Sequence, residues 1–431
     1  MNVDKNLFVH DFSVVAIMKN EGPYLKEWLN YHMIAGVDHF YLFNNDSDDD
    51  TFKIVTPYVN AGYVDLIPLS GSVMQNMAYY IAVKDYALQT RYMAFIDLDE
   101  FILPKTGKSI VETVDDIMSQ YPATGLAVNW QVFGSSGQKT ADFSKGILSR
   151  FKQRAEDNWK DNVDIYIGGY GNQHVKTIAN PRTISYFENP HYPIFFIGGK
   201  FINTNGNDVE SAFNSPVLSD KIVINHYHCK SEEEYQTKIK KGRADTDKFK
   251  HSQESFIKND KNEVFDDTIL RYRSQRAKIW QKPAADRSDK QLLNAVVNNL
   301  QPYTLSDKPK EFFENKVVTF LVCLNVIKRL RDKYPNNVTL KTLEQEALTA
   351  VEKSISTEIN LLGTQLLLRE LPQLLKLPYD TRQLRLLCYD LTFKIKKQLH
   401  EYRLWKDMAF YDYTSDYLNV LLQIKDLQVD S

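Results

Sequence analysis

Short apolar runs that alternate with helix-like segments are the feature that most limits what this chain can fold into. Val14–Met18 is a continuous apolar run, typical of a strand that is buried on both faces. In the segment that follows, Pro23 lies where a first helical turn tolerates it, and Gly36 lies where a helix would stop. The same reasoning predicts three further strands, at residues 37–44, 63–69 and 92–97, and a helix at residues 74–90. This order predicts an α/β fold whose parallel sheet has helices on both faces.

Polar loops follow three of these strands, and the third loop holds a compact acidic string. The apolar run before it leads directly into Asp97, Asp99 and Glu100. Like charges this close repel one another, and burying them without partners is costly. The loops "KNEG" and "NNDSDDD" follow the first two strands. Because ligands of such sheets bind beyond the carboxyl ends of the strands, we expect the three loops to converge on one rim.

Two aspartates at positions i and i+2 at the end of a strand can both face one hard cation. Carboxylate oxygens suit Mg²⁺ or Mn²⁺, and such an ion would relieve the repulsion between Asp97 and Asp99. Bound there, it could grip a diphosphate and stabilise the charge on a departing nucleotide. A bare DxD string is weak support, because loops are commonly polar. Its position after a buried strand makes the prediction stronger.

Composition sets broad limits on location and partners. The chain has 431 residues, enough for two or three domains, and a formal net charge of −2, which argues against non-specific nucleic-acid binding. Its three cysteines, Cys229, Cys323 and Cys388, are far apart and favour a reducing compartment. No apolar stretch is long enough to span a bilayer, and the first residues do not resemble a signal peptide. We therefore expect a cytoplasmic protein, with peripheral contact at the inner face of a membrane left open.

The second half of the chain changes character twice. Residues 125–228 are mostly strand and loop in pattern, and a helix with a Ser231–Glu234 capping box follows. The lysines of that helix, Lys238, Lys240 and Lys241, are most simply a solvated face. Beyond a polar segment near residue 285 the pattern is nearly all helical, which predicts a boundary between residues 1–285 and 286–431. These C-terminal helices could pack on the first domain, form a homodimer or hold a lipid-linked acceptor near a membrane.

Four strings in this order resemble glycosyltransferase family 92 and the related family 2-like enzymes of GT-A fold. They are "VVAIMKNEGPYLKEWLNYHMIAGVDHFYLFNNDSDDD", "RYMAFIDLDEFILP", "WQVFGSSG" and "INHYHCKSEEEYQTKIKKGRAD", spread over roughly residues 10–250. The resemblance implies a Rossmann-like GT-A domain in residues 1–285 that transfers a sugar, at family level galactose, from a UDP-sugar. It implies a glycan or lipid-linked acceptor, and bacterial surface polysaccharide assembly suits a chain of this kind. The helical third is not covered.

The resemblance also implies roles for particular residues. Asp97, Asp99 and His226 would hold the metal-bound donor, with Mn²⁺ or Mg²⁺ as the ion. The expected contacts to the nucleotide and its diphosphate come from residues of four separate segments: Asn20, Glu21, Asn44, Asn45, Asp46, Gln75, Lys230 and Arg243. Each has a plainer reading, since Glu21 suits a helix start, "NNDSDDD" a solvated turn and a lone histidine the core. His228 stays undecided, and zinc is disfavoured because "HYHC" offers no second ligand cluster.

The proton-accepting residue is not fixed by any motif. Inversion, which the resemblance implies, needs a general base for the acceptor hydroxyl. Glu188, Asp208 and Glu210 lie in the right stretch of chain, and Glu100 could act there or instead anchor a loop. Trp130 could line the acceptor site by stacking, or could equally be a core residue.

Two other classes of function stay open. A phosphatase-like hydrolase also uses strand-end aspartates with Mg²⁺, but its DxDxT string would need threonine where Phe101 stands. A non-catalytic module that binds sugar or nucleotide is the second alternative, and the intact DxD with His226 counts weakly against it.

Overall fold

The computed structural model describes residues 3–160, 171–196, 199–247, 251–279, 287–300 and 309–356. The helices predicted beyond residue 356, and Cys388, lie outside these residues. The chain divides into two compact units. An α/β unit comprises His10–Phe195 and Gly199–Arg287, and a helical unit comprises the described parts of Met1–Val9, Phe196–Gly198 and Ser288–Ser431.

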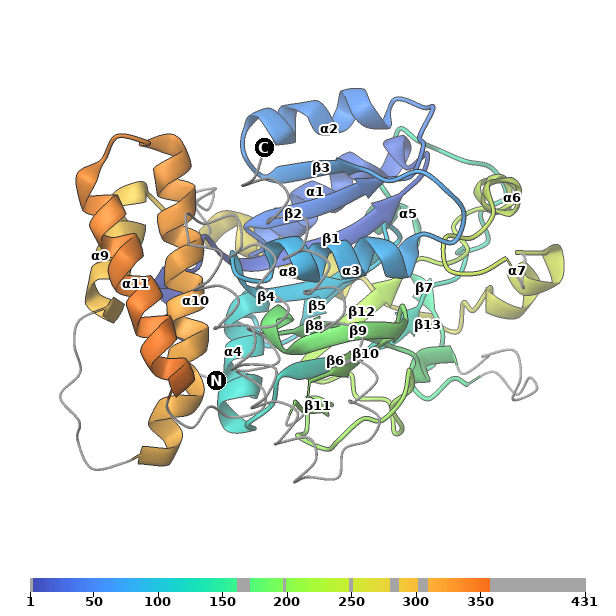
Figure 1. Ribbon diagram of the computed structural model, residues 1–431. Coiled ribbons are helices and arrows are strands. Elements are labelled where there is room, and N and C mark those ends of the chain that lie inside the picture. The colour runs from blue at the N-terminus through green and yellow to red at the C-terminus, as the bar shows by residue number, and fades with distance from the viewer. Residues whose placement is uncertain are drawn as a thin grey trace. The chain divides into compact units, whose positions relative to one another are not determined.

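The α/β unit holds all the described strands (Figure 1). Its strands are β1 (His10–Met18), β2 (His39–Asn44), β3 (Val64–Pro68), β4 (Thr90–Phe95), β5 (Glu100–Pro104), β6 (Gly125–Val132), β7 (Gln153–Arg154), β8 (Val175–Ala179), β9 (Ile184–Asn189), β10 (Tyr192–Phe195), β11 (Phe201–Ile202), β12 (Ile222–His226) and β13 (Val264–Phe265). Its helices are α1 (Gly22–Ala35), α2 (Thr51–Asn60), α3 (Gln75–Tyr86), α4 (Ile110–Gln120), α5 (Ile147–Arg150), α6 (Glu232–Lys241), α7 (Gln253–Asn259) and α8 (Thr268–Ile279), with 3₁₀ turns η2 (Gly171–Gln173) and η3 (Pro181–Thr183).

The main sheet runs in the order β3-β2-β1-β4-β8-β6-β12-β5, and β11 also pairs with β6. The first four strands are parallel, so the sequence prediction of an α/β fold is confirmed for this half. The other half is mixed, because β8 runs antiparallel to β4 and β6, and β5 runs antiparallel to β12. The carboxyl ends of β1, β2 and β4 therefore lie at one edge of the sheet.

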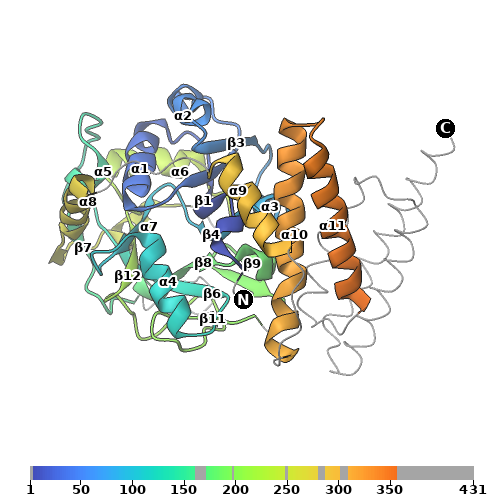
Figure 2. The same cartoon turned by 90° about the vertical axis from the view of Figure 1, so that its left-hand side faces the viewer.

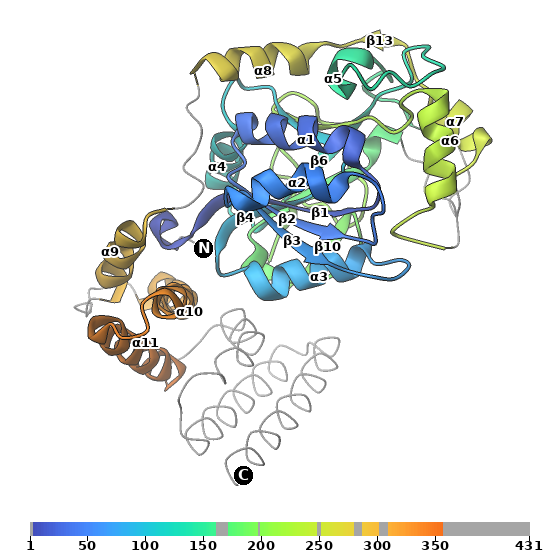
Figure 3. The ribbon, with the colours of Figure 1, turned by 90° about the horizontal axis from the view of Figure 1, so that it is seen from above.

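Helices cover both faces of this sheet, as the alternation of side chains along β1 requires. Val14 and Ala16 pack in the same apolar cluster as α1, whereas Val15 and Ile17 pack with α3. Figure 3 shows α1 and α2 on one side of the strands and α3 on the other. Burial on both faces explains the continuous apolar run Val14–Met18 in β1.

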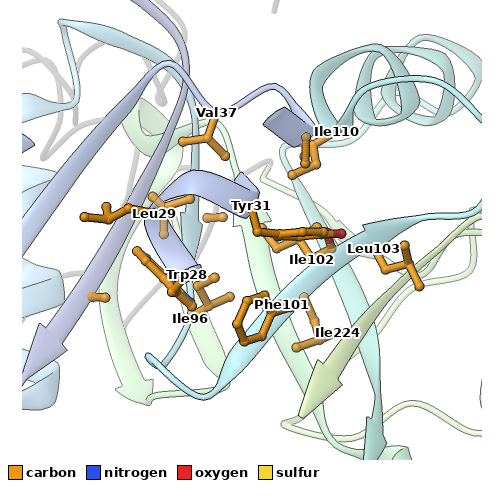
Figure 4. Close-up of a cluster of buried hydrophobic side chains, with 14 of the residues drawn as sticks. Trp28, Leu29, Tyr31, Val37, Ile96, Phe101, Ile102, Leu103, Ile110 and Ile224 are labelled. Carbon is orange, nitrogen blue, oxygen red and sulfur yellow. The ribbon is translucent and has the colours of Figure 1, made fainter. Parts of the chain in front are cut away.

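Helix α1 is fixed on the strand that follows the acidic string. The Trp28 indole donates a hydrogen bond to the Glu100 carbonyl at 2.8 Å, and the Tyr31 hydroxyl donates to the Ile102 carbonyl at 2.9 Å. All four residues are buried, and Figure 4 shows Trp28 and Tyr31 among Phe101, Ile102 and their neighbours. The backbone that carries the acids is thus held by the core.

Several local predictions are confirmed. Helix α1 has a proline in its first turn and ends at Gly36, whose φ of 112° is the left-handed conformation that favours glycine. Helix α6 begins at the predicted capping box, where Ser231 and Glu234 bond reciprocally. Helix α2 escaped prediction, and Pro57 inside it is the reason, since proline normally interrupts a helix.

The helical unit contains η1 (Lys5–Leu7), α9 (Asp289–Leu300), α10 (Pro309–Lys333) and α11 (Val338–Ser356). Figure 2 shows the last three helices side by side. The three helices contact one another, and Val296, Leu321, Val322 and Ala347 on them are buried. Among the described residues, no helix is both long and apolar enough to cross a bilayer.

Candidate active site

The first two polar loops are tied together at the carboxyl edge of the sheet. The Asn20 side chain donates to Asp48 Oδ1 at 2.7 Å and accepts from the Asp48 backbone N–H at 2.9 Å. The Gly22 backbone N–H donates to Asp49 Oδ2 at 2.9 Å, which joins the start of α1 to the same loop. The predicted convergence of "KNEG" and "NNDSDDD" is therefore observed.

The second loop is in turn tied to the loop after β3. Asn45 is buried, and its amide donates to the carbonyls of Leu69 and Gly71, both at 2.9 Å. Asp46 accepts from the Ser70 hydroxyl at 2.6 Å. Asn44 accepts from a backbone N–H within its own loop. These three predicted contact residues lie together, and their hydrogen bonds fix the shape of the rim.

Backbone strain gathers at the predicted site. Within the described residues, five that are not glycine have positive φ, and Asn20, Asp46 and Lys230 are three of them, with φ of 53°, 55° and 52°. This conformation is uncommon outside glycine and persists only where surrounding contacts hold it. Its recurrence at three predicted ligand-binding positions is what a pre-organised site would show.

Asp97 is held by two polar side chains from other elements. Its Oδ1 accepts from the Gln75 amide at 2.5 Å, and its Oδ2 accepts from the Lys176 ammonium at 3.0 Å. Lys176 lies on β8, is fully buried, and is also 3.5 Å from Glu100 Oε2. Burial alone would lower the pKa of Lys176, but Asp97 and Glu100 outweigh it and raise that pKa well above its usual value. The ammonium is therefore charged.

Glu100 lies beneath Asp97, away from solvent. Its side chain is fully buried and its Oε2 accepts from the Asp97 backbone N–H at 2.9 Å. Burial raises the pKa of Glu100, and Lys176 opposes that shift. Of its two predicted roles, catalysis or anchoring of a loop, these contacts favour anchoring.

Asp99 faces two lysines and a histidine. Lys238 Nζ is 2.8 Å from its Oδ2, Lys230 Nζ is 3.9 Å from the same atom, and His226 Nε2 is 3.5 Å from Oδ1. Burial would raise the pKa of Asp99, but Lys238 and then His226 outweigh it and hold that pKa well below its usual value. Asp99 is thus an ionised carboxylate with only 12% of its side chain exposed.

The α6 lysines correct one prediction from the sequence. Lys238 contacts Asp99, and Lys241 forms an ion pair with Glu21, so the view of these lysines as a solvated helix face is wrong for both. Lys240 is exposed, as expected. The pairs lie 139 and 220 residues apart in sequence, too far for local periodicity to reveal.

Other predicted residues lie around this centre or away from it. Arg243 pairs with Asp245 at 2.7 Å, and the backbone N–H of Gln75 donates to the carbonyl of Ala244, which brings this segment to α3. Of the base candidates, Glu188 is exposed on β9, and Asp208 and Glu210 are exposed on the chain between β11 and β12. The interactions of the described residues do not link these three acids with Asp97 or Asp99, and their role stays a prediction.

Aromatic rings border Asp99 through His226. The Trp130 ring centroid is 4.3 Å from that of His226, 4.6 Å from His174 and 5.1 Å from His191. Burial lowers the pKa of His226, so its ring is neutral at pH 7, the form that binds metals. His228 lies beside His226, 3.1 Å from Lys238 through its carbonyl.

The donor set suits a divalent cation best between Asp99 and His226. A carboxylate and a neutral imidazole face each other there across 3.5 Å. Within the described residues, no three His, Cys, Asp or Glu side chains form a ready metal-binding group. Lys238 already neutralises Asp99, so an ion at this point would share or take over that contact.

Lys176, Lys238 and Lys241 are the site residues that sequence reasoning missed. Lys176 had a readable signal, because it interrupts the apolar run of a central strand, and a buried lysine needs a carboxylate partner. For Lys238 and Lys241 on α6, no signal in the sequence pointed to the site.

The fold defines an α/β protein, and its candidate site lies beyond the ends of parallel strands, with acids and lysines facing each other. The model of glycosyltransferase family 92 matches residues 15–265, more than half of the chain, and the chain belongs to that family. The predicted fold class, an α/β GT-A-type domain followed by a helical region, is confirmed.

Curated relatives carry the same family name. One from Ricinus communis is 26% identical over 140 residues, 30% of this chain and 24% of the relative. One from Oryza sativa is 27% identical over 157 residues, 34% of this chain and 25% of the relative, and one from Arabidopsis thaliana is 38% identical over 109 residues, 23% and 18%. The chain thus spans about a quarter or less of the length of these relatives.

Solved structures of Staphylococcus aureus TarS also match. Residues 1–349 of TarS in complex with UDP give a TM-score of 0.31 at 13% identity, covering 80% of this chain and 90% of that one. Longer TarS gives 0.30 at 13% identity, with 80% and 54% covered. TM-scores this low support no conclusion about this chain.

Proposed function

We propose that this protein is a glycosyltransferase that moves a sugar from a UDP-sugar to a glycan or lipid-linked acceptor. The observation that carries the proposal is the position of the rim within the family match. Every site residue described above, from Asn20 to Arg243, lies inside residues 15–265. The rim also has the charges that a nucleotide diphosphate needs, because lysines and acids face each other there.

The chain's own residues would orient the donor. Lys176 and Gln75 fix the Asp97 carboxylate from two sides, so it does not have to reorganise during reaction. Asp97, Asp99 and His226 would hold Mn²⁺ or Mg²⁺. When bound, that cation would supply electrostatic stabilisation of the departing diphosphate. Lys230 and Lys238, which lie near Asp99, would contribute positive charge.

The finer parts of the proposal come from the sequence resemblance alone. They are galactose as the donor sugar, inversion at the transferred carbon and a role in bacterial surface polysaccharide assembly. The relatives named above are plant proteins and lend no support to the bacterial role. Cytoplasmic location and a homodimer through the C-terminal helices also stay predictions.

Titration calorimetry with UDP, with and without Mn²⁺, tests the proposal. We expect UDP to bind and Mn²⁺ to strengthen the binding. A panel of labelled UDP-sugars then separates transfer or slow hydrolysis of the donor from binding alone. A protein that ignores UDP but hydrolyses phosphate esters with Mg²⁺ would instead be the phosphatase-like alternative.

Asp99→Asn is the sharpest substitution at this site, since it keeps the side-chain size and removes the charge. We expect donor turnover to fall about a hundredfold or more, while the thermal midpoint shows that the protein still folds. Asp116→Asn on α4 is the matched control, because Asp116 is exposed and pairs with Lys108 and not with a residue of the rim. Full activity in a folded Asp99→Asn protein would refute the site.

A further inference from the structure

Two of the three lysines near the end of α6 point at acids of the rim. Lys238 pairs with Asp99 in the loop after β4, and Lys241 pairs with Glu21 in the loop after β1. They are three residues apart, so they lie on one face of the helix. Their side chains are 18% and 24% exposed, whereas Lys240 is an exposed residue of the same turn.

The helix is anchored so that this face has a fixed direction. Arg150 makes two hydrogen bonds to Glu234, at 2.8 and 2.7 Å, and both side chains are almost fully buried. The Tyr24 hydroxyl of α1 donates to Glu234 at 3.0 Å, and Ser231 caps the helix through the same carboxylate. The first turn of α6 is thus bonded to α1 and α5, and the last turn presents its lysines to the rim.

The acids at the rim bear on which cations could bind the diphosphate of the donor. A nucleoside diphosphate would bring further negative charge to a surface that already contains Glu21, Asp97 and Asp99. Lys176 is fully buried and already pairs with Asp97 and Glu100. Lys238 and Lys241 are the better placed cations, since each is partly exposed and each neutralises a rim carboxylate.

We infer that Lys238 and Lys241 form a clamp for the diphosphate of the nucleotide sugar. Without donor, their ammonium groups rest on Asp99 and Glu21. With donor bound, they pass to phosphate oxygens, which form strong charge-assisted hydrogen bonds with ammonium donors. Transfer of Lys238 also releases Asp99 to meet a divalent cation. This inference rests on the proposed function and assigns two residues to its leaving group.

The test compares Lys238→Gln, Lys241→Gln and the control Lys240→Gln in the full chain. Calorimetry with UDP and with uridine separates contacts to the phosphates from contacts to the nucleoside. We expect each of the first two variants to bind UDP about tenfold or more weakly, because each loses a charged hydrogen bond, and to bind uridine as wild type does. Lys240→Gln should match wild type for both.

Lys238→Arg guards against a variant that loses affinity through misfolding, since it keeps the charge. It should retain most of the UDP affinity, and thermal melting should show all variants folded. If wild type binds UDP and the Lys238 and Lys241 variants behave like Lys240→Gln, the clamp is wrong while the proposed function stands. If uridine affinity falls as much as UDP affinity, the clamp is also wrong. If wild type binds no UDP, both fail.

Discussion

Lys176 shows how one side chain organises the acids of the candidate site. It is a fully buried ammonium between Asp97 and Glu100, on a strand that runs antiparallel to the strand leading into the acids. A buried charge is tolerated only with compensating partners, and here each partner also needs the lysine. In this arrangement the Asp97 carboxylate is partly exposed to solvent, whereas the Glu100 carboxyl is fully buried.

Removing only the lysine should therefore cost more than removing the pair. We expect Lys176→Met to lower the free energy of unfolding by about 3–5 kcal/mol, because it removes the cation that Asp97 and the buried Glu100 share. Lys176→Met combined with Glu100→Gln should recover part of that loss. Urea unfolding of the two single variants and the double variant gives the coupling energy, and additive effects would contradict the pairing.

At this scale the sequence revealed acids better than their partners. Asp97 and Asp99 stand in a recognisable string, and His226 in another. Their lysine partners lie 79 and 139 residues away, on elements whose approach depends on the complete sheet. Pairings of this kind follow from tertiary packing, which no local periodicity encodes.

The ion pair between Arg150 and Glu234 helps to fix the position of helix α6. Burial alone would raise the pKa of Glu234, but hydrogen bonds from Arg150 and Ser231 outweigh it and lower that pKa to about 2. A carboxyl whose pKa is lower in the folded state stabilises the fold above its unfolded pKa, near 4.5, and that contribution is lost as the pH falls towards 2.

We therefore expect Glu234→Gln to destabilise the protein most at neutral pH, by about 3 kcal/mol, and progressively less between pH 4.5 and pH 2. Chemical denaturation at a series of pH values measures the difference. Glu232→Gln, in the same first turn but exposed, is the control and should give a nearly constant small effect. A pH-independent loss in Glu234→Gln would mean that packing, and not charge, holds the helix.

The sequence predicted individual helices and strands better than it predicted contacts between side chains. The run Val14–Met18, the stop at Gly36 and the capping box at Ser231 follow local rules, and each is observed. The mixed half of the sheet was missed, because strand direction in β5 and β8 is decided by which neighbour each strand finds, and short apolar runs do not carry that information.

The molecule consists of two compact units, and all the candidate site residues belong to the α/β unit. In the helical unit, Leu321 on α10 is buried. We expect Leu321→Ala to destabilise that unit by about 2–5 kcal/mol while leaving UDP affinity unchanged. Calorimetric melting and UDP titration on the same sample check this, and a parallel loss of UDP affinity would show that the units are energetically coupled.

The indole of Trp130, packed 4.3 Å from the His226 ring, makes the site optically visible. Bound Mn²⁺ is paramagnetic and quenches nearby fluorophores, so tryptophan emission should fall as the ion loads beside His226. The chain has five tryptophans, and Trp130→Phe should remove most of the quenching without removing most of the emission. Equal quenching in both proteins would place the ion elsewhere. Trp130 emission would thus report metal occupancy of the site without an added label.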